Sequence, residues 1–143
     1  MAVLRDVSAA EQRHGKAIAR RLNMYATDFE ALSFIVERGA PTSAEVGRKL
    51  GLTSGAVTGV IDRLAEQGFV ERVDDPQDRR KVAVRPVAAR MEPVSELFGP
   101  IESALAGLVA RYSQQQIATI AQFLLQAAEL VVARAETLER GRT

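Results

Sequence analysis

Residues 42–67 read TSAEVGRKLGLTSGAVTGVIDRLAEQ, two short amphipathic segments joined at Gly51. A helix-turn-helix holds two helices at a steep angle across a short turn, so it needs small residues in the turn and apolar residues at fixed offsets. Gly47 and Gly51 meet the first demand. The inward positions of both segments are apolar, namely Val46, Leu50, Val57, Val60, Ile61 and Leu64. The stretch therefore predicts a helix-turn-helix, with helices over about 42–50 and 53–67.

The outward face of the second segment starts with small polar residues and carries Ser54, Gly55, Thr58, Gly59, Asp62 and Arg63. A DNA major groove accepts such a surface, because small residues allow close approach and hydroxyls bond base edges or phosphates. The amides at a helix N-terminus add a site for a phosphate. The alternative is an exposed helix face without a role, since serine and threonine are common on protein surfaces.

Two valine-rich segments follow, at 69–73 and 81–85, and Asp75-Pro76 between them favours a turn. This pattern predicts a β-hairpin. Its tip carries Asp78-Arg79-Arg80-Lys81. A charge run is usually a solvated face. Beside a helix-turn-helix, however, a basic hairpin fits along a DNA backbone or places an arginine in a minor groove.

Helix starts are indicated by Ser or Thr residues followed three positions later by Glu or Gln: Ser8 and Glu11, Thr27 and Glu30, Thr42 and Glu45, and Ser113 and Gln116. Each pair predicts a capping box, in which the two side chains satisfy free amides at a helix start. Glycines at 39, 51 and 68 fall where left-handed helix ends are expected. We expect flanking helices over about 8–26, from 27 onward and from about 93, with Pro100 starting or kinking a turn.

The last helix repeats apolar residues at alternating steps of four and three, and we call these residues the C-terminal seam: Ile117, Ala121, Leu124, Ala128, Val131, Ala135 and Leu138. This is the a/d spacing of a coiled coil. With the amphipathic first helix, it favours a dimer interface built from both ends of the chain. The alternative is that the seam packs inside the monomer, because periodicity alone does not identify the facing helix.

Composition argues against several classes of function. The 143 residues suit one globular domain, and a formal net charge of +1 means that attraction to nucleic acid depends on where the basic residues lie. Without cysteine and with one histidine, thiol chemistry is excluded and neither a metal nor another cofactor is expected. The chain has no nucleophile elbow or phosphate loop, so we expect no enzyme. Finding no signal peptide and no apolar run of membrane-spanning length, we expect a cytoplasmic protein without membrane contact.

Residues from about 42 to 85 resemble the core of MarR-family regulators. The resemblance rests on Leu50 to Thr58, Ile61 to Leu64, Gly68 to Val70 and Asp75 to Arg80. It implies a mainly α fold (α+β), a winged helix-turn-helix with N- and C-terminal dimerisation helices. Within a single domain over 1–143, it places the DNA-binding lobe at 28–90 and the dimerisation helices at 1–27 and 91–143.

The same resemblance implies a homodimer whose two lobes bind a roughly palindromic operator in double-stranded DNA. The residues expected against DNA are Ser43, Thr53, Ser54, Gly55, Thr58, Arg63, Arg79, Arg80 and Lys81. The small helix residues would face the major groove and Arg63 the backbone. The arginines of the hairpin, or wing, would enter the minor groove.

Asp62 needs a separate explanation, because an aspartate on a DNA-facing helix repels phosphate unless it is neutralised. The family pattern places this aspartate against the wing arginine of an Asp-x-Arg sequence, matched here by Asp78-Arg79-Arg80. We therefore expect Asp62 to pair with Arg80, so that Asp62 and Asp78 orient the wing.

Many members of the family, as the resemblance implies, release DNA when a small aromatic or anionic effector binds between the lobes. The candidates here are His14, Arg20, Tyr25 and Phe29. A structural role is the stronger explanation for each of them, since a histidine on an apolar stripe, such as His14, is more often a core or interface residue and Tyr25 is more often a packing residue. We expect a sequence-specific transcriptional repressor that an effector releases from DNA. The alternative is a winged-helix dimer that serves as a protein-interaction adaptor without a specific DNA site, which the cations of the wing disfavour.

Overall fold

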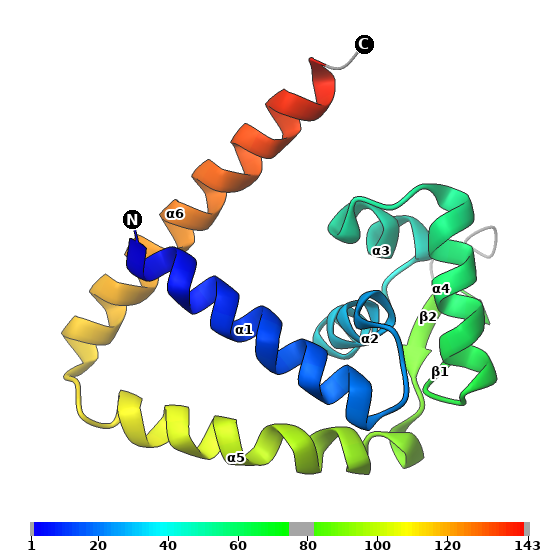
Figure 1. Ribbon diagram of the computed structural model, residues 1–143, viewed down its shortest axis with the longest axis horizontal. Helices are drawn as coiled ribbons and strands as arrows, with labels where there is room; N and C mark the ends of the chain where they lie inside the picture. The colour runs from blue at the N-terminus through cyan, green and yellow to red at the C-terminus, as the bar shows by residue number, and fades with distance from the viewer. Residues whose placement is uncertain (1, 75–81, 142–143) are drawn as a thin grey trace. The chain divides into compact units, whose positions relative to one another are not determined.

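The computed structural model of the protein is mainly helical and describes residues 2–74 and 82–141 (Figure 1). In chain order its elements are α1 (Ala2–Arg21), α2 (Ala26–Arg38), α3 (Ser43–Leu50), α4 (Ser54–Glu66), β1 (Val70–Asp74), β2 (Val82–Pro86), η1 (Ala88–Arg90), α5 (Glu92–Val109) and α6 (Gln114–Arg140). The predicted fold class, mainly α with one hairpin, is confirmed. The chain forms two compact units, Met1–Phe98 and Gly99–Thr143.

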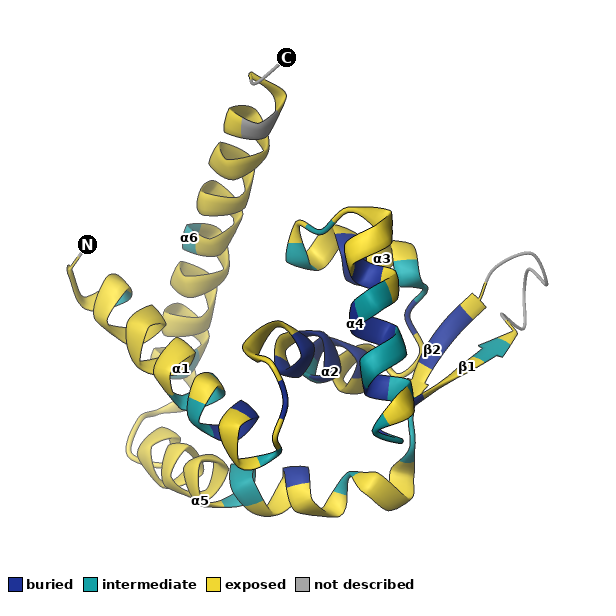
Figure 2. Cartoon of the chain, turned by 45° about the vertical axis from the view of Figure 1, so that its right-hand side comes forward, coloured by how far each residue is buried: buried dark blue, intermediate teal, exposed yellow. Residues whose placement is uncertain are grey.

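The core of the first unit lies among α2, α3 and α4. Its most deeply buried apolar side chains are exposed by 1% or less: Ala31, Leu32, Ile35, Val46, Ile61, Leu64 and Val84. Figure 2 shows this burial as dark blue bands on α2 and α4. Full burial of one leucine-sized side chain contributes about 1.5–3 kcal/mol. The inward positions predicted for the helix-turn-helix are confirmed, with Leu50 partly rather than fully buried.

Two glycines set the angle between α3 and α4. Gly51 adopts a left-handed conformation, with φ 64°, that side-chain-bearing residues rarely take. A Cβ at Gly47 would lie 3.4 Å from the carbonyl oxygen of Leu52, so the turn packs directly against the α3 backbone. The Leu52 amide donates a hydrogen bond to the Gly47 carbonyl over 2.9 Å. The turn therefore favours glycine at 51 through its backbone conformation, while Gly47 gives the turn a close but ordinary contact with α3.

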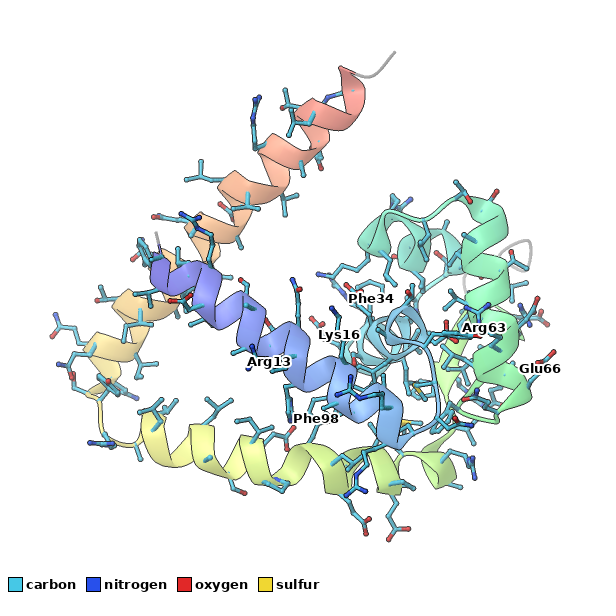
Figure 3. The ribbon with its side chains drawn as sticks, in the orientation of Figure 1. Arg13, Lys16, Phe34, Arg63, Glu66 and Phe98 are labelled. Carbon is cyan, nitrogen blue, oxygen red and sulfur yellow. The ribbon has the colours of Figure 1, made fainter. Side chains whose placement is uncertain are left out.

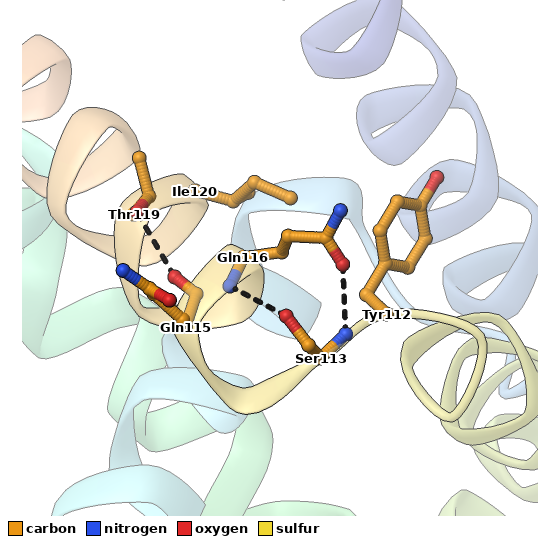
Figure 4. A pocket seen from close by; sticks show the side chains of 6 residues that line it. All are labelled: Tyr112, Ser113, Gln115, Gln116, Thr119 and Ile120. Atoms are coloured by element: carbon orange, nitrogen blue, oxygen red, sulfur yellow. Dashed lines mark hydrogen bonds between the residues drawn. The ribbon is translucent and has the colours of Figure 1, made fainter.

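Two of the four predicted capping boxes are confirmed. At the start of α3, the Glu45 amide donates to Thr42 Oγ1 and the Thr42 amide donates to Glu45 Oε2 over 2.7 Å. The hydrogen bond from the Thr42 amide, followed by that from its hydroxyl, lowers the pKa of Glu45 and favours its ionised form. At the start of α6, Ser113 and Gln116 form the same reciprocal pair, which lines a pocket of about 620 Å³ (Figure 4).

The other two boxes, at Ser8 and Thr27, are wrong. The helix α1 begins at Ala2 and passes through Ser8, because residues 2–7 are also compatible with a helix and nothing in them stops it. The helix α2 begins one residue before Thr27, and its N-cap position is Tyr25, which makes no side-chain capping bond. Serine and threonine inside a helix satisfy the same local pattern as a cap, so spacing alone did not separate the two cases.

The hairpin pairs β1 and β2 in antiparallel register, from Val70 opposite Pro86 to Asp74 opposite Val82. Each strand is displaced by one residue from its predicted range. The segment before α3 joins the edge of β2, where the Val84 amide donates to the Pro41 carbonyl over 2.8 Å. This contact fixes the base of the hairpin against the entry to the helix-turn-helix. Residues 75–81, which include the predicted turn, lie outside the described residues.

One expectation for the C-terminal helices is met only in part. Pro100 lies inside α5, nine residues before its end, so it does not start a helix, while a kink at Pro100 stays a prediction. By length and composition, Gln114–Leu138 of α6 is apolar enough to cross a membrane, so the expectation that the chain has no such run is wrong. None of that segment is buried in the described part of the chain. The apolar seam and the alanines beside it give this segment its high average hydropathy, although Glu129, Arg134 and Glu136 also lie within it.

The capping results predict different costs for two similar substitutions. Thr42→Ala should lower the free energy of unfolding by about 1 kcal/mol, because it removes a side-chain bond to a helix-start amide. Ser8→Ala should leave it nearly unchanged, since Ser8 is exposed within α1 and alanine is the better helix former. Urea denaturation followed by circular dichroism measures both. Equal losses in the two variants would contradict the assigned start of α1.

Candidate nucleic-acid interface

The first turns of α4 present a small polar surface. Ser54, Gly55 and Thr58 are exposed, while Val57 and Val60 on the opposite side of the helix are buried. Thr58 Oγ1 donates to the Ser54 carbonyl over 2.8 Å, which leaves the hydroxyl oxygen able to accept a bond from outside. The helix thus faces its core with branched apolar side chains and turns its small residues outward.

The small size of Gly55 has no explanation in packing. A Cβ at this position would meet no heavy atom of the described residues within 4 Å. Glycine inside a helix is destabilising by roughly 1 kcal/mol relative to alanine. A glycine that the fold does not need, on an exposed helix face, favours close approach by a partner outside the chain.

Two further DNA candidates lie at helix starts. Thr53 is the N-cap of α4, and its Oγ1 accepts a bond from the Ala56 amide over 3.3 Å. Ser43 is the first residue of α3 and is partly buried. Both positions stand beside free helix-start amides, which bind anions. Their contact with DNA stays a prediction.

Arg63, expected at the DNA backbone, has an internal partner. Its Nε and terminal nitrogen donate to the two carboxylate oxygens of Asp28 over 2.8 and 2.6 Å. Figure 3 shows Arg63 on α4, on the side that faces α2. The carboxylate is buried, whereas 41% of the Arg63 side chain is exposed. The hydrogen bonds to Asp28 raise the pKa of the Arg63 guanidinium and favour its charged form.

Tyr25 completes this group. The Arg63 guanidinium lies over its ring, 5.2 Å from the centroid, and 69% of Tyr25 is exposed to solvent. The ring therefore covers the outer side of the ion pair instead of entering the core. The link between Arg63 and Asp28 is not predictable from the sequence pattern, because no local spacing joins residues that lie 35 positions apart.

Asp62 contacts the hairpin through Arg72, an arginine for which the sequence predicts no such pair. Arg72 of β1 donates to Asp62 Oδ1 over 2.6 Å, with 40% and 50% of the two side chains exposed. The expected partner, Arg80, lies outside the described residues, as do Asp78, Arg79 and Lys81. The pair with Arg80 thus stays a prediction. Asp62 is joined to the wing, and the strand residue Arg72 is the functional candidate that the sequence analysis left unassigned.

The four ligand candidates do not form one cluster. Phe29 stacks on Phe98, with ring centroids 5.7 Å apart, and His14 meets the same ring edge-on at 6.0 Å. Tyr25 instead contacts Arg63, and Arg20 is exposed on α1. A groove of about 500 Å³ runs beside α1 and α2, lined by Ser8, Glu11, Gln12, Gly15, Lys16, Ala26, Phe29, Glu30 and Ser33. Only Phe29 among the four candidates borders it.

Within residues 2–74 and 82–141, no group of three or more His, Asp or Glu residues could hold a metal ion. Two ion pairs of the first unit involve α4. Asp28 and Arg63 join this helix to α2, and Asp62 and Arg72 join it to β1.

The comparisons with known proteins agree with this architecture. The model of the MarR family matches residues 16–82. A relative from Bacillus subtilis (strain 168), an uncharacterized HTH-type transcriptional regulator named YcgE, is 33% identical over 125 residues, which make up 87% of this chain and 81% of the relative. The chain belongs to the MarR family. As a MarR-family transcriptional regulator, it carries a DNA-binding winged helix. We call α4, the second helix of the helix-turn-helix, the recognition helix, and the β1–β2 hairpin the wing.

Solved structures show the same MarR fold. The structure of a MarR family protein from Bacillus stearothermophilus has a TM-score of 0.68 at 23% identity, with 92% of this chain and 91% of that chain covered. A mutant S. aureus MepR, solved bound to an oligodeoxyribonucleotide, has a TM-score of 0.59 at 14% identity, with 91% and 96% covered.

The ion pair between the recognition helix and the wing generates a prediction. Asp62→Ala and Arg72→Ala should each weaken DNA binding by about two- to fivefold, because an exposed ion pair contributes up to about 1 kcal/mol. Both variants should also speed hydrogen exchange in β1. The measurements are fluorescence anisotropy and exchange followed by mass spectrometry.

Glu71→Ala is the matched control. It removes the same charge as Asp62→Ala and breaks the pair of Glu71 with Arg85 in the same hairpin, also 2.6 Å long, but this pair does not reach α4. Its DNA affinity should stay at or above that of the wild type. If Asp62→Ala bound DNA as well as Glu71→Ala does, the link between α4 and β1 would have no part in DNA binding.

Proposed function

We propose that this MarR-family protein is a sequence-specific repressor that binds a palindromic operator in double-stranded DNA as a homodimer. The observation that carries the proposal is the exposed start of α4, where Ser54, Gly55 and Thr58 form a small polar surface that packing does not explain. A major groove admits a helix, and its base edges bond hydroxyl groups. Occupation of an operator excludes other proteins from the same DNA, so we propose repression.

We further propose that the remaining DNA contacts surround this surface. The helix starts at Ser43 and Thr53 offer amides to the phosphate backbone. Arg79, Arg80 and Lys81 of the wing would reach the backbone and the minor groove, where narrow stretches concentrate negative potential. Asp78 would help to orient the wing.

The exposed C-terminal seam supports the homodimer. Leu124, Val131 and Leu138 are exposed by 47%, 68% and 57% in the single chain. Val3 and Val7 of α1 are exposed as well, by 71% and 59%. Exposed apolar surface of this extent indicates an interaction site, and a second copy of the same seam is self-complementary about a two-fold axis. A two-fold dimer matches a palindromic operator.

A membrane is a poorer environment for α6. Glu129, Arg134 and Glu136 all lie within Gln114–Leu138, and charged side chains in a bilayer interior are costly. A helix with charges between its apolar positions suits an interface between protein helices in water. We therefore propose that the protein acts in the cytoplasm.

An effector completes the proposal. A small aromatic or anionic molecule would bind beside α1 and α2 and release the DNA. The groove of about 500 Å³ there has an aromatic side chain, Phe29, and a cation, Lys16, among its lining residues. His14, Arg20 and Tyr25 are further candidates from the sequence alone. We propose no catalytic role, because the family is one of transcriptional regulators.

The DNA proposal is tested by fluorescence anisotropy with DNA from the region upstream of the gene and a scrambled fragment, over a salt series. We expect preference for the upstream fragment and an affinity that falls as salt rises, because phosphate contacts release counterions. Gly55→Leu should weaken this binding by at least about tenfold, or about 1.4 kcal/mol. The variant should stay folded, because Gly55 is exposed, a Cβ there meets no described heavy atom within 4 Å, and glycine is the poorer helix former.

Glu37→Leu is the control, since it adds a leucine at an exposed position of α2. Its affinity should equal that of the wild type. Full operator affinity in Gly55→Leu would remove the start of α4 from the interface. Equal weak binding of both fragments by the wild type would contradict the operator proposal and favour a protein-interaction adaptor.

The homodimer is tested by sedimentation velocity. Leu124→Arg places a charge in the C-terminal seam and should shift the protein from dimer to monomer, with a loss of operator affinity because the two lobes are no longer joined. Gln126→Arg adds the same charge on the other side of α6 and should leave the dimer intact. A monomeric wild type, or a dimeric Leu124→Arg variant, would contradict the proposed interface.

A further inference from the structure

Among the described residues, Asp28 is the one polar or charged residue that is buried, with 1% of its surface exposed. It lies in the first turn of α2, where the helix dipole favours a negative charge. That field alone does not replace the water that an ionised carboxylate loses on burial. The carboxylate therefore depends on a partner inside the protein.

Arg63 is that partner. Two parallel hydrogen bonds, of 2.8 and 2.6 Å, join its guanidinium to both oxygens of Asp28. Such a two-point pair fixes the plane and direction of the guanidinium, which a single contact does not. The ring of Tyr25, 5.2 Å from the guanidinium carbon, covers it further. If Arg63 left this position to reach a phosphate, the Asp28 carboxylate would stay buried without a partner.

The pair acts on the orientation of α4. The other contacts that hold this helix to α2 are apolar, and the hydrophobic effect is not directional. A bond between Asp28 on α2 and Arg63 on α4 fixes the rotation of α4 about its own axis. That rotation determines whether Gly55 and Thr58, on the exposed face of the same helix, point at a base edge.

We propose that Arg63 is a positioning residue of the recognition helix, held by Asp28 and covered by Tyr25, and that it does not bind a DNA phosphate. The inference rests on the proposed function, since it explains how the DNA-reading surface is held. It replaces the backbone contact that the sequence predicts for Arg63.

Arg63→Lys separates the two roles. Lysine keeps the positive charge, so it would preserve a phosphate contact, but it cannot form the two-point pair with a carboxylate. We expect Arg63→Lys to lose operator affinity to nearly the same extent as Arg63→Ala, by roughly tenfold. Both variants should keep the salt dependence of the wild type, because neither would lose a phosphate contact. Loss of one phosphate contact would reduce the steepness of log K against log salt by about 0.9. Restoration of affinity by lysine, or a slope reduced by about one in Arg63→Ala, would overturn the inference.

Asp28→Asn should change operator affinity in opposite directions, depending on whether Arg63 positions α4 or binds a DNA phosphate. The substitution preserves the shape of the side chain and removes its charge. A positioning pair predicts weaker operator binding, whereas a guanidinium released to bind phosphate would strengthen it and steepen the salt dependence. In the double variant Asp28→Asn/Arg63→Lys, the loss should be close to that of the worse single variant, because both changes break one pair. Additive losses would overturn the inference.

Hydrogen exchange of the free protein supplies a readout that needs no DNA. Arg63→Lys and Asp28→Asn should speed the exchange of α4 amides, whereas Glu71→Ala, which breaks an ion pair remote from this site, should not. Unchanged α4 exchange in both variants would overturn the positioning role. Failure of the wild type to prefer its upstream DNA would instead contradict the proposed function, and the exchange result would still decide whether the pair orients α4.

Discussion

The carboxylate of Asp28 lies in the interior between α2 and α4, where an ionised group is stable only with a well-placed partner. Arg63 supplies two bonds to it, and the arginine belongs to the helix whose outer face carries the small polar residues. Apolar contacts hold the two helices together but tolerate small rotations. The ion pair restricts those rotations, so the direction of the exposed face depends on a group buried on the other side of the helix.

The next residue in the chain extends this control to the wing. Asp62 and Arg63 are neighbours on α4, yet their side chains reach different elements, since Asp62 binds Arg72 of β1 and Arg63 binds Asp28 of α2. The other end of α4 is set by the turn, where Gly47 allows the Leu52 backbone to approach. Short-range contacts thus hold the recognition helix to α2, to β1 and to the turn that follows α3. A DNA-reading surface needs this rigidity, because a misplaced group loses its base-edge bond.

The parts of the fold that were predicted from the sequence depend on local chemistry. The apolar positions of α3 and α4, the cap at Thr42 and the left-handed Gly51 each follow from residues a few positions apart. The errors arise where a local pattern has two outcomes, as at Ser8, which fits either a cap or a helix interior. The Asp28–Arg63 and Asp62–Arg72 pairs were missed because tertiary packing, and not spacing, brings their partners together.

The ion pairs also change how the charge of the protein is interpreted. Arg63, Arg72 and Arg85 each bind a carboxylate within the described first unit, so their charges are partly neutralised before any DNA arrives. Arg90 lies over the ring of Phe69 and donates to the Gln67 carbonyl. Counting basic residues near the hairpin therefore overstates its attraction for phosphate. With a formal net charge of +1, the protein has little general affinity for nucleic acid to rely on. In the proposed function, recognition therefore rests on the fit of α4 as well as on the wing cations, and the internal ion pairs hold α4 in place.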